Sequence, residues 1–263
     1  MHNNPVSNAF IVHDLKVISE TAERLGKKAD ADRYRRQMEA TTEAYIRKFV
    51  SKKGIVAKDY QSAYIMALKF VLPEGELREQ VKKNFAANIR KNGLQTGFFA
   101  TEYLLPLLVE AGETELAYDI LLQEGCPGWM YQVKCGATTT WERWDALKPD
   151  GTVNEEKMAG SGDNMVSFNH YAFGSVGEFY YQYILGIKPQ KPGFAELHFE
   201  PYPDRRLGGV SGSYLSRAGK IESSWKYEED GCHISLNTPV KSEVVLPDGK
   251  KETVEAGTYQ WLC

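Results

Sequence analysis

The sequence has 263 residues, of which 42% are hydrophobic and 25% charged, as in an ordinary globular protein of one large domain or two modest ones. Its net charge of −3 and its isoelectric point near 6.0 indicate no basic surface, so we expect no nucleic-acid partner. No apolar run reaches the roughly 18 residues of a membrane-spanning helix, so we expect no membrane partner.

The first 125 residues predict helices. Residues 8–25 and 30–49 carry apolar side chains at helical spacing, with Gly26 ending the first helix and Asp30 capping the second. Further helices are predicted, in chain order, at residues 60–71, 76–92, 99–111 and 113–124, and after a long loop at 171–187.

The predicted helices alternate in character. The segments 30–49, 76–92 and 113–124 are amphipathic, whereas 60–71 and 99–111 are apolar almost all round. An inner ring of buried helices wrapped by an outer ring gives this alternation, which favours an α/α toroid. A simple helix bundle is the alternative.

Two changes of character follow. From residue 125 to 169 the helical period is lost, and a loop of this length in a compact domain is functional or disordered. Beyond residue 192, apolar and polar residues alternate between turn signals, which predicts six or seven short antiparallel strands in a β-sandwich of about 70 residues. We therefore expect a helical domain over 1–188 and a β-sandwich domain over 189–263.

Three clusters could carry chemistry. Glu142 lies between Trp141 and Trp144, where partial exclusion of water can tune a carboxylate for acid–base work. The alternative is a structural ion pair with Arg143. His170, at the start of the last predicted helix, could bind a ligand or be an ordinary core histidine. The third cluster, "TGF" at 96–98, could line a cleft or form a turn.

The sequence gives no sign of a cofactor or metal. It has no GxSxG, GxxxxGK[ST], HExxH or CxxC motif. The five histidines and four cysteines are scattered without metal-ligand spacing. We therefore expect neither a metal nor a cofactor, while the sequence leaves the cellular compartment open.

Several segments together resemble the family 78 glycoside hydrolases, the bacterial α-L-rhamnosidases. The most specific are "GATTTWERWD" at 136–145 and "FNHYAFGSVGE" at 168–178. The others are "TGF" at 96–98, "YLLPLL" at 103–108, "LAYDILLQ" at 116–123 and "PGWMY" at 127–131. The ending "PDGKKETVEAGTYQW" is similar to the β-sandwich that closes these enzymes. The resemblance covers nearly the whole chain.

The resemblance implies an (α/α)6 toroid of twelve helices and hydrolysis with inversion by two carboxylates, about 6.5–9.5 Å apart with a water between them. It implies that Glu142 is the base that activates this water and that His170 contacts the sugar. Trp129, Trp141 and Trp144 would form walls of the sugar pocket. The implied partner is a rhamnose-containing glycoside.

One departure from the family is clear. Residues 1–125 lack its acidic motif for the general acid, and only about seven toroid helices are predicted. We therefore expect the second half of a partial (α/α)6 toroid followed by a small antiparallel β-sandwich, in a fragment or a split or decayed gene. Such a chain is expected to be inactive without the N-terminal half of the enzyme, and to self-associate through exposed apolar helices.

Other functions are compatible with the same residues. The chain could be a carbohydrate-binding or structural remnant without catalysis. It could also come from another (α/α)6 toroid glycosidase or from a glycan phosphorylase, although no cluster of basic residues for phosphate stands beside Glu142.

Overall fold

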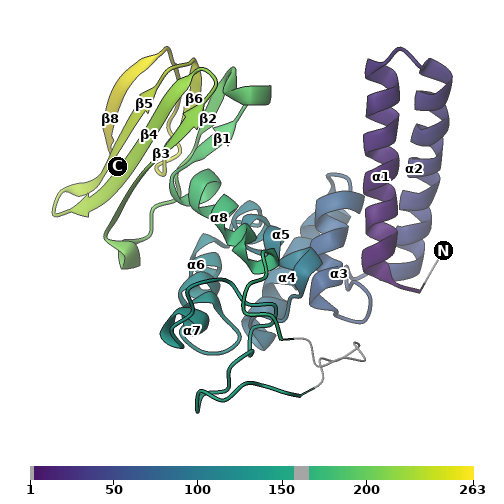
Figure 1. The fold of residues 1–263 in the computed structure, drawn as a ribbon. Helices are drawn as coiled ribbons and strands as arrows, with labels where there is room; N and C mark the ends of the chain where they lie inside the picture. The colour runs from purple at the N-terminus through teal and green to yellow at the C-terminus, as the bar shows by residue number, and fades with distance from the viewer. Residues whose placement is uncertain (1–2, 157–165) are drawn as a thin grey trace. The chain divides into compact units, whose positions relative to one another are not determined.

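The computed structural model describes residues 3–156 and 166–263. Contacts within the chain define two compact units, residues 1–173 and 174–263 (Figure 1). The contacts thus divide the chain at 173/174, whereas the sequence changes character near 188/189. Helix α8 (Val176–Phe179) lies between these two positions, and strand β1 (Ile187–Pro189) crosses the second. Among the described residues, no helix combines the length and apolarity needed to cross a bilayer.

The first unit is helical, as predicted. Its elements are α1 (Pro5–Arg24), α2 (Lys28–Phe49), α3 (Gln61–Met66), the π-helical turn η1 (Ala67–Val71), α4 (Glu76–Asn92), α5 (Phe98–Glu110), α6 (Thr114–Leu122) and α7 (Trp129–Lys134). The two longest helices, α1 and α2, form a hairpin (Figure 1). The short helix α7 lies in the stretch where the sequence predicted a loop.

The predicted contrast in burial is confirmed. All six residues of α3 are buried, and so are seven of the thirteen residues of α5. In α2 only Ala31 and Tyr45 are buried. The inner and outer helices of a toroid differ in this way, because only inner helices are covered on most sides.

Helix α1 exposes an apolar stripe. Ile11, Ile18 and Leu25 recur every seven residues and are 45%, 43% and 67% exposed. Side chains seven residues apart share one helix face. Self-association was expected through the predicted helices 60–71 and 99–111, whose residues are mostly buried, so this stripe is a different apolar surface.

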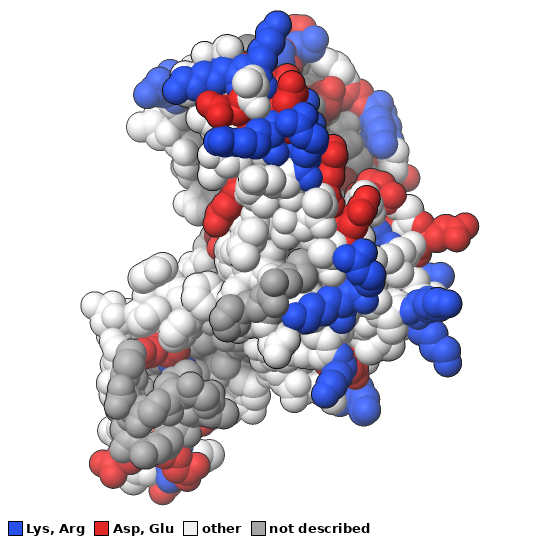
Figure 2. All heavy atoms as spheres, turned by 90° about the vertical axis from the view of Figure 1, so that its right-hand side faces the viewer, with Lys and Arg blue, Asp and Glu red and all other residues white. Residues whose placement is uncertain are grey.

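Charge on the first unit is balanced. Figure 2 shows Lys and Arg side chains interspersed with Asp and Glu over the face that it presents. Some of these charges pair between helices, as Arg35 of α2 does with Glu23 of α1 at 2.9 Å. Exposed pairs of this kind contribute little to stability, but they keep the surface free of a strong field of one sign.

A buried amide fixes the loop before α5. Gln61, which is 2% exposed, donates from Nε2 to Asn88 Oδ1 at 3.1 Å and to the Gly93 carbonyl at 2.9 Å. Its Oε1 accepts from the Gln95 backbone N–H at 2.8 Å. A fully satisfied buried amide locks the backbone that it contacts. The loop therefore delivers Thr96 and Phe98 in a defined position.

A broken helix starts at the end of the first unit and continues into the second. Residues 172–184 form a 3-10 turn, η2 (Ala172–Ser175), then α8 (Val176–Phe179) and the π-helical η3 (Tyr180–Ile184). The single helix predicted over 171–187 is therefore too long. Gly186 adopts φ +74°, and the chain continues directly into a strand, so the helical run ends at Ile184.

Two four-stranded sheets complete the unit. The first has the order β1 (Ile187–Pro189), β2 (Leu197–Phe199), β6 (Ser242–Val245), β7 (Lys251–Val254). The second has the order β3 (Gly209–Ser216), β4 (Gly219–Glu228), β5 (Gly231–Thr238), β8 (Gly257–Leu262).

The strand prediction was nearly complete. Beyond residue 192 the described residues form seven strands, β2 to β8, which agrees with the six or seven expected, but one pair, β2 with β6, is parallel rather than antiparallel. The chain makes strands β3, β4 and β5 between β2 and β6, and such a long connection allows parallel pairing.

Strand β4 anchors the segment that precedes β1. The Trp225 indole, 1% exposed, donates to the Ile184 carbonyl at 2.7 Å, and Ser223 Oγ donates to the Leu185 carbonyl at 2.7 Å. Next to them, a Cβ on Gly186 would lie 2.4 Å from the Pro201 nitrogen. The backbones at residues 186 and 201 therefore pack too closely for any side chain at 186.

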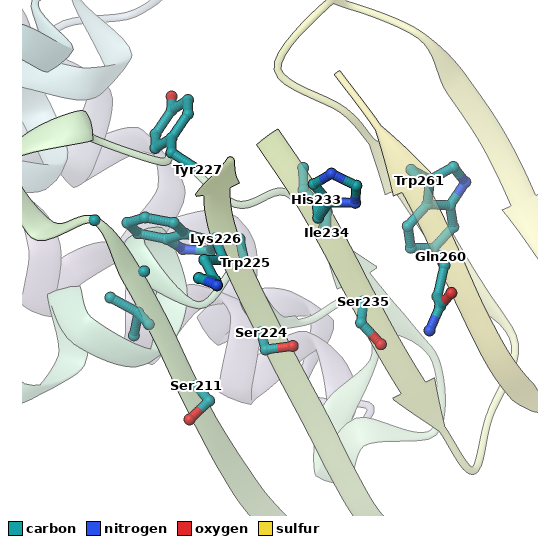
Figure 3. A pocket seen from close by; sticks show the side chains of 13 residues that line it. Ser211, Ser224, Trp225, Lys226, Tyr227, His233, Ile234, Ser235, Gln260 and Trp261 are labelled. Atoms are coloured by element: carbon teal, nitrogen blue, oxygen red, sulfur yellow. The ribbon is translucent and has the colours of Figure 1, made fainter. Parts of the chain in front are cut away.

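The outer face of the second sheet is polar. A hollow of about 670 Å³ lies over it, and four side chains in register cross its floor (Figure 3). These residues are Ser211, Ser224, Ser235 and Gln260.

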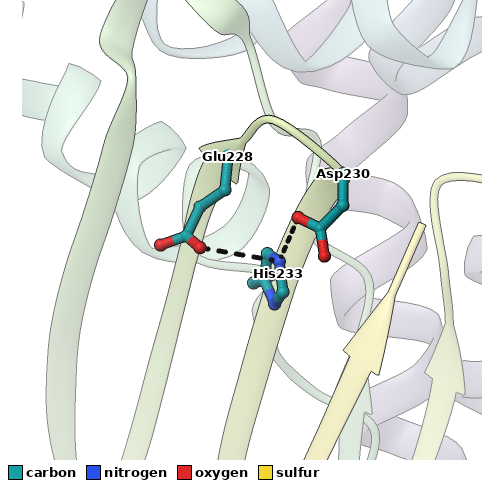
Figure 4. A group of neighbouring side chains, drawn as sticks. All are labelled: Glu228, Asp230 and His233. Atoms are coloured by element: carbon teal, nitrogen blue, oxygen red, sulfur yellow. Dashed lines mark hydrogen bonds and ion pairs between the residues drawn. The ribbon is translucent and has the colours of Figure 1, made fainter.

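An exposed cluster stands at the turn between β4 and β5 (Figure 4). There His233 Nε2 lies 2.8 Å from Asp230 Oδ1 and 3.8 Å from Glu228 Oε2. The hydrogen bond to Asp230, and then the nearby negative charges, raise the pKa of His233.

Replacing Gly186 with alanine should destabilise the second unit strongly. We expect Gly249→Ala, at another positive φ of +87° but with open space around it, to cost about 1 kcal/mol. Gly186→Ala adds a backbone clash and should cost about 1–3 kcal/mol more. Urea denaturation followed by tryptophan fluorescence measures both. Equal losses in the two variants would contradict the close approach at residue 186.

Candidate active site

The site is built around a backbone ladder between two distant loops. The His170 N–H donates to the Thr140 carbonyl at 2.9 Å, and the Glu142 N–H donates to the Ser167 carbonyl at 2.9 Å. These two hydrogen bonds, one donated from each segment, align residues 140–142 with 167–170. The ladder places the two most specific sequence segments side by side, although neither belongs to a regular helix or strand there.

Glu142 is buried and oriented. It is 3% exposed, and its Oε2 accepts the Ser167 backbone N–H at 2.9 Å. Among the described residues, Oε1 has no hydrogen-bond partner. A carboxylate held by one oxygen keeps a fixed direction for the other, which is the arrangement that a water-activating base requires.

Arg143 does not neutralise Glu142. Its guanidinium makes two hydrogen bonds to the Asp145 carboxylate, at 2.7 and 2.9 Å, and a third to the Glu156 carbonyl at 2.6 Å. Asn154 Nδ2 adds a bond to Asp145 Oδ2 at 2.7 Å. The structural ion pair considered for Glu142 is therefore made by Asp145.

This ion pair shifts the titration of both partners. The hydrogen bond from Arg143 is the main cause that holds the pKa of Asp145 below its usual value, and the hydrogen bond to Asp145 raises the pKa of Arg143. Asp145 is thus committed as an anion that braces the loop. Glu142 is left without a cationic partner among the described residues.

Aromatic rings form a continuous array near the ladder. Trp129 meets Trp144 edge to face at 5.0 Å between ring centroids, and Trp144 stacks on Phe173 at 3.8 Å. Phe173 in turn contacts Phe98 at 5.6 Å. The array therefore gathers five rings from four parts of the chain, once His170 is included.

His170 ends the array. Its imidazole stacks on Phe98 at 4.6 Å and on Tyr171 at 5.3 Å. Its Nδ1 accepts the Ala172 backbone N–H at 3.3 Å, so in the neutral ring Nε2 carries the proton. The half-buried imidazole can therefore donate a hydrogen bond from Nε2 to a ligand.

The indole nitrogens of the array are already satisfied. Trp144 Nε1 donates to the Thr96 carbonyl at 3.0 Å, and Trp129 Nε1 donates to the Phe173 carbonyl at 2.9 Å. These bonds fix the two rings, so they can offer only their faces or edges to a ligand.

Trp141 lies apart from the array. It is 2% exposed, packs with Tyr131 and Ala146, and meets Phe168 edge to face at 5.5 Å. Its backbone N–H donates to Gln132 Oε1 at 3.2 Å. The structure thus gathers Trp129, Trp144 and His170 in one array and places Trp141 in the core of the loop.

Sequence reasoning missed the partners that hold these residues. Phe98 and Phe173 connect the predicted site residues, and Ser167 orients Glu142. Phe98 belongs to the "TGF" segment that was open between cleft and turn, so a signal was present for it. Nothing local distinguishes Ser167, because it acts through its backbone N–H.

Replacing Asp145 with asparagine should destabilise the loop in a pH-dependent way. Because the folded pKa of Asp145 is depressed, its stabilisation is present above the usual value of 3.8 and is lost as the pH falls through the folded value. We expect Asp145→Asn to cost about 1 kcal/mol at pH 7 and little at pH 2. Urea midpoints of both proteins at the two pH values measure this. A loss of equal size at both would contradict the ion pair.

Comparison with known proteins matches both units. Residues 1–184 match the family model described as the bacterial alpha-L-rhamnosidase 6 hairpin glycosidase domain, and residues 186–260 match that of the bacterial alpha-L-rhamnosidase C-terminal domain. A curated alpha-L-rhamnosidase from Alteromonas sp. is 35% identical over 248 residues, which cover 92% of this chain and 26% of the relative. Another from Streptomyces avermitilis is 32% identical, with 95% and 24% covered.

Solved structures agree. The alpha-L-rhamnosidase of Aspergillus terreus superposes with a TM-score of 0.87 at 30% identity, covering 96% of this chain and 29% of that one. The Streptomyces avermitilis enzyme complexed with L-rhamnose gives the same TM-score and identity, covering 96% and 26%. The chain spans about a quarter of the length of these relatives. It belongs to the bacterial alpha-L-rhamnosidase family.

Proposed function

We propose that the chain carries the water-activating half of an inverting α-L-rhamnosidase site, with Glu142 as the general base. The observation that carries this proposal is the isolation of Glu142. Its carboxylate is buried and oriented by the Ser167 N–H, while the neighbouring Arg143 is taken by Asp145. The names of the relatives, and the L-rhamnose in one of their structures, support rhamnose as the sugar.

In this proposal the general acid, the second carboxylate of the reaction, lies outside these 263 residues. Inverting hydrolysis needs an acid about 6.5–9.5 Å from the base, on the opposite face of the sugar ring. Asp145 is an unsuitable acid, because its ion pair favours the charged form. The relatives are about four times longer than the region matched here, so they contain ample sequence to supply the acid.

The sugar would be held by the aromatic array. Rhamnose is a neutral ring with hydroxyls and a methyl group, and such a ring fits aromatic faces with a few donors beside them. His170 would donate from Nε2 to a hydroxyl, while Trp144 and Trp129 form the wall of the subsite. Trp141 would hold the backbone next to Glu142 in place, because its ring is packed in the loop core.

The mechanism follows from this geometry. Glu142 accepts a proton from water through its free oxygen as the water attacks the anomeric carbon. The Ser167 N–H keeps the carboxylate in place throughout. The glycosidic oxygen departs with a proton from the acid supplied by the rest of the enzyme.

A chimera tests the role of Glu142. Residues 1–184 replace the matching segment of the Streptomyces avermitilis relative, and hydrolysis of a rhamnoside is measured. We expect Glu142→Gln to lower kcat by about 10²–10⁴-fold, because an amide cannot take a proton from water. Rhamnose affinity should change little, since the amide keeps the shape of the carboxylate.

Glu155→Gln is the matched control, because Glu155 is an exposed glutamate of the same segment. It should leave kcat unchanged. A Glu142→Gln chimera that kept more than a tenth of its rate would place the base elsewhere. A glucoside tested in parallel separates a rhamnosidase from another toroid glycosidase.

The chain by itself should bind rhamnose weakly and hydrolyse nothing. Even an activated aryl rhamnoside, which needs little help from an acid, should show no turnover above buffer, because part of the pocket wall is supplied by the rest of the enzyme. Release of the phenolate from the purified chain measures this. Turnover that Glu142→Gln abolished would show that these residues complete a working pocket without further sequence.

A further inference from the structure

Two of the three consecutive threonines before Trp141 bind the opposite loop. Thr140 Oγ1 donates to the His170 carbonyl at 2.6 Å, and Thr139 Oγ1 donates to the Phe168 carbonyl. Thr138 is exposed and makes no hydrogen bond among the described residues. Two of the three threonines thus bind the opposite loop through their hydroxyls, and the third does not.

The bond from Thr140 is reciprocal. The Thr140 carbonyl accepts the His170 N–H at 2.9 Å, and its hydroxyl donates back to the His170 carbonyl at 2.6 Å. Both backbone polar groups of His170 are therefore fixed by one residue. With φ and ψ restrained in this way, the imidazole is held between Phe98 and Tyr171, which it stacks on at interplanar angles of 16° and 9°.

The clamp is also rigid on its own side. Thr140 directly precedes Trp141, whose N–H is bound by the buried Gln132 and whose ring is packed in the loop core. A β-branched threonine has few side-chain conformations, so its hydroxyl loses little entropy when it makes this bond. Thr140 thus links the His170 imidazole to the buried residues around Trp141.

We propose that Thr140 is a positioning residue that holds the His170 imidazole in the aromatic stack, with the Thr139 hydroxyl as a second clamp. The sugar contact of His170 rests on the proposed function above. The positioning itself does not, because it concerns only groups of this chain. Neither threonine needs to touch the substrate to affect its binding.

The stack provides a direct spectroscopic test on the 263-residue chain. A ring between two parallel aromatic faces has its proton signals moved upfield, so the imidazole protons of His170 should be shifted in the NMR spectrum. A His170→Gln variant identifies them. Thr140→Val, which keeps the shape and removes the hydroxyl, should abolish more than half of this shift.

Three variants serve as controls. Thr140→Ser keeps the hydroxyl and should restore the shift, and Thr138→Val should leave it unchanged. Thr139→Val should give a smaller loss than Thr140→Val. The signals of His13, whose ring packs against that of Phe70 in a tilted arrangement with 4.5 Å between centroids, report whether the same unit stays folded. Unmoved His170 signals in Thr140→Val, with His13 intact, overturn the proposal, and so does a Thr140→Ser variant that behaves like valine.

Binding gives the second readout. Titration with rhamnose should show about a tenfold weaker affinity for Thr140→Val, which corresponds to about 1.4 kcal/mol, and nearly full recovery for Thr140→Ser. Glu142→Gln should leave the His170 signals in place. If no variant, including the unmodified chain, binds rhamnose, the proposed function loses its support, while the NMR result still decides whether Thr140 positions His170.

Discussion

The ladder between residues 140–142 and 167–170 is the constraint on which the candidate site depends. Two irregular loops, from segments 25–30 residues apart, are joined by backbone hydrogen bonds and by the hydroxyls of Thr139 and Thr140. Each of these bonds starts from a group close to the main chain, so little side-chain freedom is lost in forming it. The direction of the Glu142 carboxylate and the stacking of His170 both follow from this registration.

Two neighbouring carboxylates acquire opposite characters within this frame. Asp145 receives the Arg143 fork and the Asn154 amide, so its charge is compensated and its position is structural. Glu142 receives one backbone N–H and is 3% exposed. The orientation of one arginine therefore decides which acid braces the loop and which remains available for proton transfer. The two carboxylates thus differ in their hydrogen-bond partners, although they lie only three residues apart in the sequence.

Much of the fold could be predicted from the sequence, because periodicity is a local property. Helices α1, α2 and α4 to α6 match their predicted ranges closely, and so does the burial of α3. The six-residue α7 and the three-residue β1 and β2 are too short to show a period. The parallel pairing of β2 with β6 depends on which distant strands meet, which no local pattern encodes.

In the site, the choice of Glu142 as the base rests on its two tryptophan neighbours in the sequence and on the family resemblance, and it stays a prediction. The pairing of Arg143 with Asp145 rather than with Glu142 could not be predicted, because both carboxylates lie within two residues of Arg143. The connecting rings, Phe98 and Phe173, come from segments 75 residues apart and are brought together only by the tertiary fold.

The ladder has a consequence for how such a site can diversify. It closes at Glu142 and Ser167, so the two ends of the sequence between them are fixed. The entropy of closing a loop rises only with the logarithm of its length, and doubling the length costs about 0.6 kcal/mol. A change in the number of residues between these two ends therefore costs little while the carboxylate stays in register. The direction of Glu142 is set by the contacts of residues 140–142 with 167–170, whatever the length of the sequence between them.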